Sequence, residues 1–165
     1  MKQVEYVKCE NFNFLTLNGL YNGDYDSLKN LDLNILRIIE MESPISLNML
    51  KARLREAMDI KKISQKALDI INDRLDYYGI IRTNNLYEEI LWPKEGVFEV
   101  DYLRVGGDVQ IYDIAYQELT NLTKELISKG LSGEELYREV LSFFKLEVLT
   151  EKAFNYLKFI EEKSQ

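Results

Sequence analysis

Apolar residues recur at helical spacing between residues 33 and 78, and the polar residues between them mark where each helix begins and ends. A short helix is predicted over residues 33–41 and ends before Ser43-Pro44. Two more helices are predicted after the N-capping residues Ser46 and Ser64, and Gly79 ends the second of them. Their buried faces are expected to carry Leu47, Leu50, Leu54 and Ala57 in one helix, and Ala67, Ile70, Ile71, Leu75 and Tyr78 in the next.

Two runs rich in β-forming residues follow these helices, over residues 80–83 and 86–92. Asn84-Asn85 between them tolerates positive φ, which suits a tight hairpin turn. Trp92 at the end of the hairpin is expected to close the core, with stacking on a base as the less favoured alternative. Three helices and a terminal hairpin predict a winged-helix domain over residues 33–93.

The segments on either side of this domain have fewer structural signals. Residues 1–32 are interpreted as an extended entry segment, because two short alternating runs precede a series of turn-forming residues. Residues 94–113 contain two alternating runs around Gly106-Gly107, which predict a connecting β-hairpin. A phosphate-binding glycine loop is the competing interpretation, but such a loop leads into a helix, and here β-like runs flank the glycines.

Residues 114–165 are again helical, with helices predicted over 114–128, 134–144 and 150–162. A displacement of 86 residues without a gap aligns Ser46 with Ser132 and Ser64 with Thr150, and it also superimposes the apolar positions of the helices. The chain then stops without a second hairpin. The predicted fold class is therefore mainly α with short β-hairpins: tandem winged-helix-like three-helix units, the second lacking its wing.

Composition places the chain among ordinary globular proteins, with 165 residues of which 46% are apolar and 30% charged. No apolar run is long enough to span a membrane, and the N-terminus does not resemble a secretory signal, so a cytoplasmic protein without membrane contact is expected. The net charge of −7 is unevenly distributed. Between residues 51 and 85 there are eight basic residues and five acids, so this stretch alone is positive. Charges scattered on helices usually form a solvated face, and a polyanion-binding surface is the alternative.

Catalysis is not expected, because the chain has no histidine and no nucleophile elbow, phosphate loop or zinc-protease motif. Glu88-Glu89 lies in a predicted strand, where adjacent side chains point to opposite faces. The lone Cys9 has no imidazole to activate it and no second soft ligand for zinc. Neither a cofactor nor a metal site is predicted.

Three short motifs carry a resemblance to a known family: EMESPI at residues 40–45, ARLREAM at 52–58 and ILWP at 90–93. The stretch 33–93 resembles a winged-helix-like bacterial domain of unknown function found near the C-terminus of large superfamily-one helicase-like proteins. The resemblance implies an accessory module of a DNA-processing helicase or nuclease system. It implies no helicase activity, because the chain lacks the motor motifs.

Two functions remain open from the sequence. In the first, the module binds duplex DNA weakly through the third helix and the hairpin, as helix-turn-helix proteins do. The residues expected to contact DNA are Lys61, Lys62, Gln65, Lys66, Arg82, Asn84 and Asn85. In the second, the module docks on a helicase or nuclease partner without touching DNA. The second is favoured by Asp69, Asp73 and Asp76, which continue the exposed face of the same helix and would repel phosphate.

Overall fold

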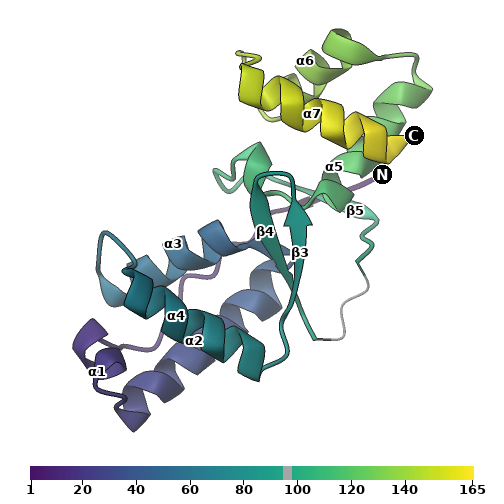
Figure 1. The fold of residues 1–165 in the computed structure, drawn as a ribbon. Coiled ribbons are helices and arrows are strands. Elements are labelled where there is room, and N and C mark those ends of the chain that lie inside the picture. The colour runs from purple at the N-terminus through teal and green to yellow at the C-terminus, as the bar shows by residue number, and fades with distance from the viewer. Residues whose placement is uncertain (95–97) are drawn as a thin grey trace. The chain divides into compact units, whose positions relative to one another are not determined.

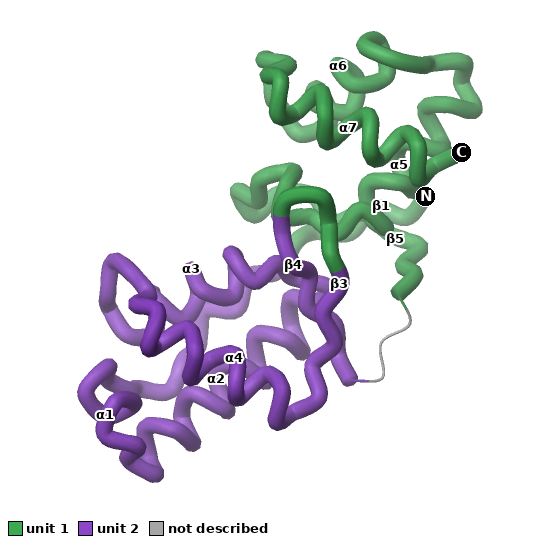
Figure 2. Tube along the Cα trace, in the orientation of Figure 1, with its two compact units in different colours: residues 1–6, 84–87, 97–165 green, residues 7–83, 88–96 purple. Residues whose placement is uncertain are grey.

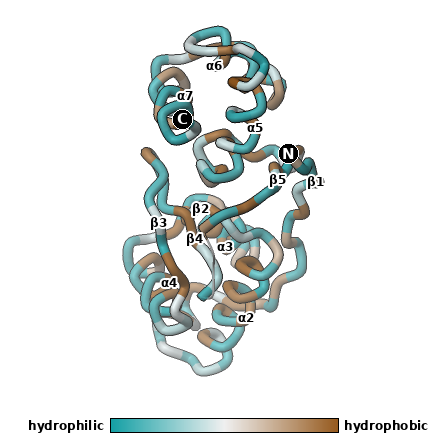
Figure 3. The backbone as a smooth tube through the Cα atoms, turned by 90° about the vertical axis from the view of Figure 1, so that its right-hand side faces the viewer, coloured by the Kyte–Doolittle hydropathy of each residue, from teal (hydrophilic) through white to brown (hydrophobic). Residues whose placement is uncertain are grey.

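The computed structural model describes residues 1–94 and 98–165 and is mainly helical, with a few short strands in small sheets (Figure 1). The chain divides into two compact units (Figure 2). Unit 1 contains residues 1–6, 84–87 and 97–165, and unit 2 contains residues 7–83 and 88–96. Hydrophobic and hydrophilic residues alternate along the helices of each unit, as expected of helices that cover a core on one side (Figure 3).

Unit 2 has the element order helix, strand, helix, helix, strand, strand after a short first helix. The elements are α1 (Leu17–Tyr21), α2 (Tyr25–Glu42), β2 (Ile45–Ser46), α3 (Leu47–Met58), α4 (Gln65–Tyr77), β3 (Ile81–Asn85) and β4 (Glu88–Trp92). The sheet has the order β2-β4-β3, with Ile45 opposite Leu91 in the antiparallel β2–β4 pair. Strand β2 therefore joins the hairpin to the start of α3.

The predicted caps of α3 and α4 are confirmed. The hydroxyl of Ser46 accepts a hydrogen bond from the backbone N–H of Met49 at 2.9 Å, and that of Ser64 accepts one from Ala67 at 3.1 Å. Gly79 follows α4 with φ of +67°, a conformation that glycine adopts without steric cost and that ends the helix as predicted. Trp92 is buried, and its indole N–H donates to the hydroxyl of Thr83, so it belongs to the core as expected.

The prediction of an extended segment over residues 1–32 is wrong. Helix α1 lies within it, and α2 begins at Tyr25 rather than at residue 33. The turn-forming run at 18–27 hides these helices, because Thr16 caps α1 and only one short turn separates α1 from α2. The remaining extended part, residues 7–16, has no strand partner.

Polar side chains of α2 hold this extended part by its backbone. A carboxylate oxygen of Glu42 accepts from the N–H of Cys9 at 3.1 Å. The amide of Asn34 accepts from the N–H of Asn13 at 2.7 Å and donates to its carbonyl at 2.9 Å. Two further bonds of this kind join Arg37 to the carbonyl of Asn11 and Asn30 to the carbonyl of Phe14. The segment thus runs along one face of α2, and the side chains that hold it replace the ladder of a sheet.

The hairpin turn lies two residues later than predicted. Strand β3 extends to Asn85 and β4 starts at Glu88, so Leu86 and Tyr87 form the turn in place of Asn84-Asn85. The reason is that Asn85 is buried and uses its side chain in hydrogen bonds within unit 1, which keeps it in the strand.

Unit 1 consists of a small sheet and three helices. Strand β1 (Lys2–Glu5) pairs in parallel with β5 (Tyr102–Val105), and η1 (Ile111–Asp113), α5 (Tyr116–Ser128), α6 (Gly133–Phe143) and α7 (Glu151–Ser164) follow. The predicted hairpin over residues 94–113 is therefore wrong where the structure describes it, because β5 takes its partner from the N-terminus and residues 111–113 are helical. Residues 95–97 of that prediction lie outside the described residues. The three predicted helices agree with α5, α6 and α7 to within two residues.

The 86-residue displacement holds for the observed helices. It carries the N-caps Ser46 and Ser64 onto the N-caps Ser132 and Thr150. It also carries the span of α2 onto residues 111–128, which hold η1 and α5. The apolar positions that the displacement pairs are buried in both units, namely Leu50 and Leu136, Leu54 and Val140, Ala67 and Ala153, and Ile71 and Leu157. The apolar faces of α3 and α4 thus recur in α6 and α7.

Candidate nucleic-acid interface

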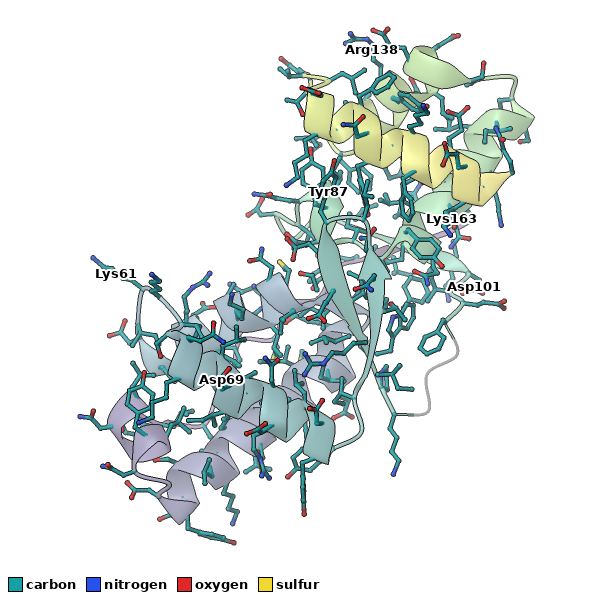
Figure 4. The ribbon with its side chains drawn as sticks, in the orientation of Figure 1. Lys61, Asp69, Tyr87, Asp101, Arg138 and Lys163 are labelled. Atoms are coloured by element: carbon teal, nitrogen blue, oxygen red, sulfur yellow. The ribbon has the colours of Figure 1, made fainter. Side chains whose placement is uncertain are left out.

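The turn between α3 and α4 presents the first two of the predicted DNA-contacting residues. Lys61 and Lys62 are both exposed there, and Figure 4 shows Lys61 extending away from the ribbon of unit 2. Ile63 beside them is buried and fixes the turn against the core. Two exposed ammonium groups on this turn could contact a phosphate.

The first turn of α4 is less available than the sequence suggested. Gln65 is exposed, but its side-chain amide donates to a carboxylate oxygen of Asp69 at 2.8 Å. The ammonium nitrogen of Lys66 lies 4.6 Å from the centroid of the Tyr21 ring, a cation–π geometry. Each of these side chains would exchange an existing interaction for any contact with DNA.

The outer face of α4 is acidic along its length. Asp69, Asp73 and Asp76 are exposed and lie one turn apart, and Figure 4 shows Asp69 on this helix. Arg74 does not offset them, because it forms a bidentate pair with Asp32 at 2.7 and 2.6 Å. This helix therefore presents carboxylates where a DNA-recognition helix presents donors.

Asp32 organises a cluster that the sequence analysis missed. Its carboxylate accepts from Arg74 and also from the hydroxyl of Tyr78 at 2.8 Å. Burial, followed by the bond to Asp32, raises the pKa of the Tyr78 hydroxyl. Arg74 and Tyr78 lie 42 and 46 residues after Asp32 in the sequence, so no local sequence pattern indicates this cluster. The cluster ties α2 to the C-terminal end of α4.

The hairpin residues do not form the predicted DNA-contacting surface. Arg82 donates to the side-chain oxygen of Asn72 at 3.0 Å and lies 3.5 and 3.7 Å from the carboxylates of Asp76 and Glu89. Its charge is therefore balanced within unit 2. Asn84 is exposed. The prediction for Asn85 is wrong, because only 1% of it is exposed.

Asn85 lies in a buried polar network of unit 1. Its side-chain nitrogen donates to the carbonyl of Ile114 at 2.9 Å and to the hydroxyl of Tyr156 at 2.7 Å. The Tyr156 hydroxyl donates in turn to the Ile114 carbonyl at 3.0 Å. Burial raises the pKa of Tyr156, and the hydrogen bond from Asn85 opposes this shift.

Three tyrosines and a lysine surround this network. The rings of Tyr87, Tyr112 and Tyr156 lie within 5.4 to 6.1 Å of one another. The ammonium nitrogen of Lys152 lies 4.1 Å from the centroid of the Tyr112 ring and 4.9 Å from that of the Tyr87 ring. Figure 4 labels Tyr87 at the hairpin tip, which we define as residues 84–87. The hairpin tip is thus a packed part of unit 1.

No family model, curated protein or solved structure matches this chain. Among the described residues, no group of three or more cysteine, aspartate or glutamate side chains could hold a metal ion. No helix within residues 1–94 and 98–165 is both long and apolar enough to cross a membrane.

Proposed function

We propose that this chain is a non-catalytic protein-interaction module made of two winged-helix-like units, of which the second lacks a wing. The winged-helix interpretation of unit 2 is supported by its element order and by the strand order β2-β4-β3, in which the strand before α3 joins the hairpin. The second winged-helix-like unit is supported by the displacement of 86 residues between matched caps and buried positions.

One observation carries the choice of an interaction module over a DNA-binding module. The hairpin tip, which contacts the DNA backbone in a winged-helix protein that binds DNA, here belongs to unit 1. Asn85 is buried in it, and Tyr87 contacts Tyr112, Tyr156 and Lys152. The acidic face of α4 supports the same choice, because its carboxylates would repel phosphate.

The partner class follows from the resemblance of residues 33–93. That resemblance favours a DNA-processing helicase or nuclease, on which this module would dock. Weak DNA binding is the second candidate function, and it is favoured by the exposed Lys61 and Lys62.

The two functions are separated by fluorescence anisotropy with a labelled duplex at about 50 and about 200 mM salt. We expect no salt-dependent binding by the unmodified chain. The double variant Lys61→Glu/Lys62→Glu should then behave as the unmodified chain does. Binding that appears at low salt, and that this double variant loses, would contradict the interaction-module proposal and support the DNA-binding function.

A matched variant tests the role of the acids. Asp69→Asn/Asp73→Asn removes two charges from the α4 face and keeps the size of both side chains. If these acids keep the module off DNA, the variant should gain weak, salt-sensitive binding that the unmodified chain lacks. A helicase or nuclease retained by the chain from cell extract after digestion of nucleic acid would identify the partner.

A further inference from the structure

Unit 1 contains an apolar groove of about 540 Å³ next to the turn between α6 and α7. One wall of the groove consists of the end of α6, the turn and the start of α7. The lining residues of this wall include Leu141, Phe144, Leu146, Val148, Thr150 and Ala153. Val148 is 71% exposed and Leu146 44% exposed. A second hollow of about 380 Å³ shares Phe144, Asp108 and Val109 with the first. The two hollows therefore adjoin at these three residues.

The matching position in unit 2 is filled by α1. The displacement of 86 residues carries Leu146, Thr150 and Ala153 back to Ile60, Ser64 and Ala67. Helix α1 packs against α4, and Leu20 and Tyr21 belong to the same apolar cluster as Ile60 and Ala67. The hydroxyl of Tyr21 also lies 2.6 Å from Oγ of Ser64, the N-cap of α4.

Unit 1 has no helix at the corresponding place in the chain. The span of α1 corresponds to residues 103–107, which form most of β5 and the glycine pair Gly106-Gly107. A strand with two glycines fills less space than a helix whose diameter with side chains is about 10–12 Å. A Cβ atom built on Gly106 would meet nothing within 4 Å. By the displacement of 86 residues, the groove thus corresponds to the position that α1 covers in unit 2.

The charges at the groove indicate what would flank the occupant. Asp108 and Glu147 line the groove and are both exposed. The hydroxyl of Thr150 accepts from the N–H of Ala153 at 3.1 Å and keeps its own proton for another acceptor. In unit 2 the corresponding hydroxyl, that of Ser64, accepts from the N–H of Ala67 and also bonds to the hydroxyl of Tyr21.

We infer that this groove binds a short amphipathic helix of the partner protein, with two aliphatic side chains three residues apart, a tyrosine directly after the second, and a neighbouring basic residue. The pattern is that of Leu17, Leu20 and Tyr21 in α1, and the basic residue would pair with Asp108 or Glu147. This inference rests on the proposed function, since it names the surface through which the interaction module meets its partner. Helix-in-groove docking of this kind is a common mode of peptide recognition.

The test uses a synthetic peptide with the sequence of residues 12–23, which contains α1, with Asn22→Lys as the neighbouring basic residue, and the full chain labelled with ¹⁵N for two-dimensional NMR. We expect binding with a Kd of about 1 mM or tighter, with shifts concentrated on the amides of residues 144–153. A peptide carrying Leu20→Asp and Tyr21→Ala should not bind. The variant Val148→Glu should weaken binding at least tenfold, because it places a carboxylate in the groove.

Val7→Glu is the matched control, because Val7 is also an exposed valine outside the helices and lies in unit 2. It should bind the peptide as the unmodified chain does. No shifts at millimolar peptide, equal binding by Val148→Glu, or shifts confined to Ser64 and Lys66 would each overturn the inference. The last pattern would mean that the peptide only exchanges with α1 in unit 2. DNA binding that is lost in Lys61→Glu/Lys62→Glu would instead contradict the proposed function, so the two failures are distinguishable.

Discussion

The side-chain nitrogen of Asn85 lies 2.7 Å from the hydroxyl oxygen of Tyr156, a residue 71 positions further along the chain. Both side chains also bond to the carbonyl of Ile114, and all three groups are buried. The donors of this network are all satisfied, whereas the side-chain oxygen of Asn85 is buried without a hydrogen-bond partner among the described residues. The Asn85 side chain therefore acts in the folding of unit 1 rather than in recognition.

Replacing Asn85 with alanine should lower the free energy of unfolding by about 2–3 kcal/mol, because the carbonyl of Ile114 and the hydroxyl of Tyr156 each lose a donor in a buried site. Asn84→Ala is the matched control, since Asn84 is the exposed neighbour in the same strand, and it should change stability by about 0.5 kcal/mol or less. Urea denaturation followed by circular dichroism measures both. Equal losses in the two variants would contradict the buried role of Asn85.

Alkaline pH should destabilise unit 1 through Tyr156. Burial raises the pKa of its hydroxyl in the folded state above the ordinary value of about 10. The folded state thus holds this proton more tightly than the unfolded chain does. The resulting stability is fully present below pH 10 and is lost as the pH rises above 10 toward the folded-state pKa.

Urea titrations at about pH 8 and about pH 11 test this, and Tyr156→Phe should be less stable at the lower pH but lose less stability between the two. Parallel losses in the two proteins would show that Tyr156 does not carry this pH dependence. Tyr137 adds to the loss in both proteins, because burial and the bond to Glu161 raise its pKa as well.

The Glu42→Gln variant should unfold far more easily than the native chain. Glu42 and Arg53 form a buried bidentate pair with contacts of 2.7 and 2.8 Å, so the variant removes the negative charge that the buried Arg53 guanidinium contacts. The expected loss is about 3–5 kcal/mol. Glu56→Gln is the control, because Glu56 pairs with Lys8 at the surface, where the expected loss is at most about 1 kcal/mol. Chemical denaturation measures the unfolding midpoints of both variants. Similar midpoints for Glu42→Gln and Glu56→Gln would contradict this prediction.

Two serine N-caps, Ser64 of α4 and Ser132 of α6, should differ in importance. Ser64 accepts from the N–H of Ala67 and bonds to Tyr21, so Ser64→Ala should cost about 1–2 kcal/mol. Ser132 caps α6 without a side-chain hydrogen bond to its first turn, so Ser132→Ala should cost a few tenths of a kcal/mol. The ranking is read from the thermal midpoints of the two variants, and the reverse ranking would contradict these cap geometries.

The sequence predicted the elements whose signals are local. Helices α3 and α4 begin directly after the serines that cap them, and their apolar residues repeat at helical spacing. The displacement by 86 residues located α6 and α7 in the same way. The early start of α2 was not predicted, because asparagine, glycine and aspartate immediately precede the helix and these residues are typical of loops.

Pairings between distant residues could not be predicted. Lys2 lies opposite Tyr102 in the parallel β1–β5 pair, and neither strand carries a local mark of its partner. The same applies to the candidate site. Asparagine is common in turns, but Asn85 is a buried strand residue because its side chain bonds to the Ile114 carbonyl and the Tyr156 hydroxyl. The sequence did indicate some of the exposed charges, since Lys61 and Lys62 in the turn and Asp69 on α4 lie on the surface as predicted.

The hydrogen bonds from α2 to residues 9–14 have a consequence for how this protein can diverge. Because these bonds reach backbone atoms, they place little demand on the identity of the residues in the extended segment. Natural variation should therefore be tolerated at Glu10, Asn11 and Phe14 but resisted at Asn34 and Glu42. Relatives of this chain would then share the polar positions of α2, while the sequence of the extended segment that α2 holds would differ among them.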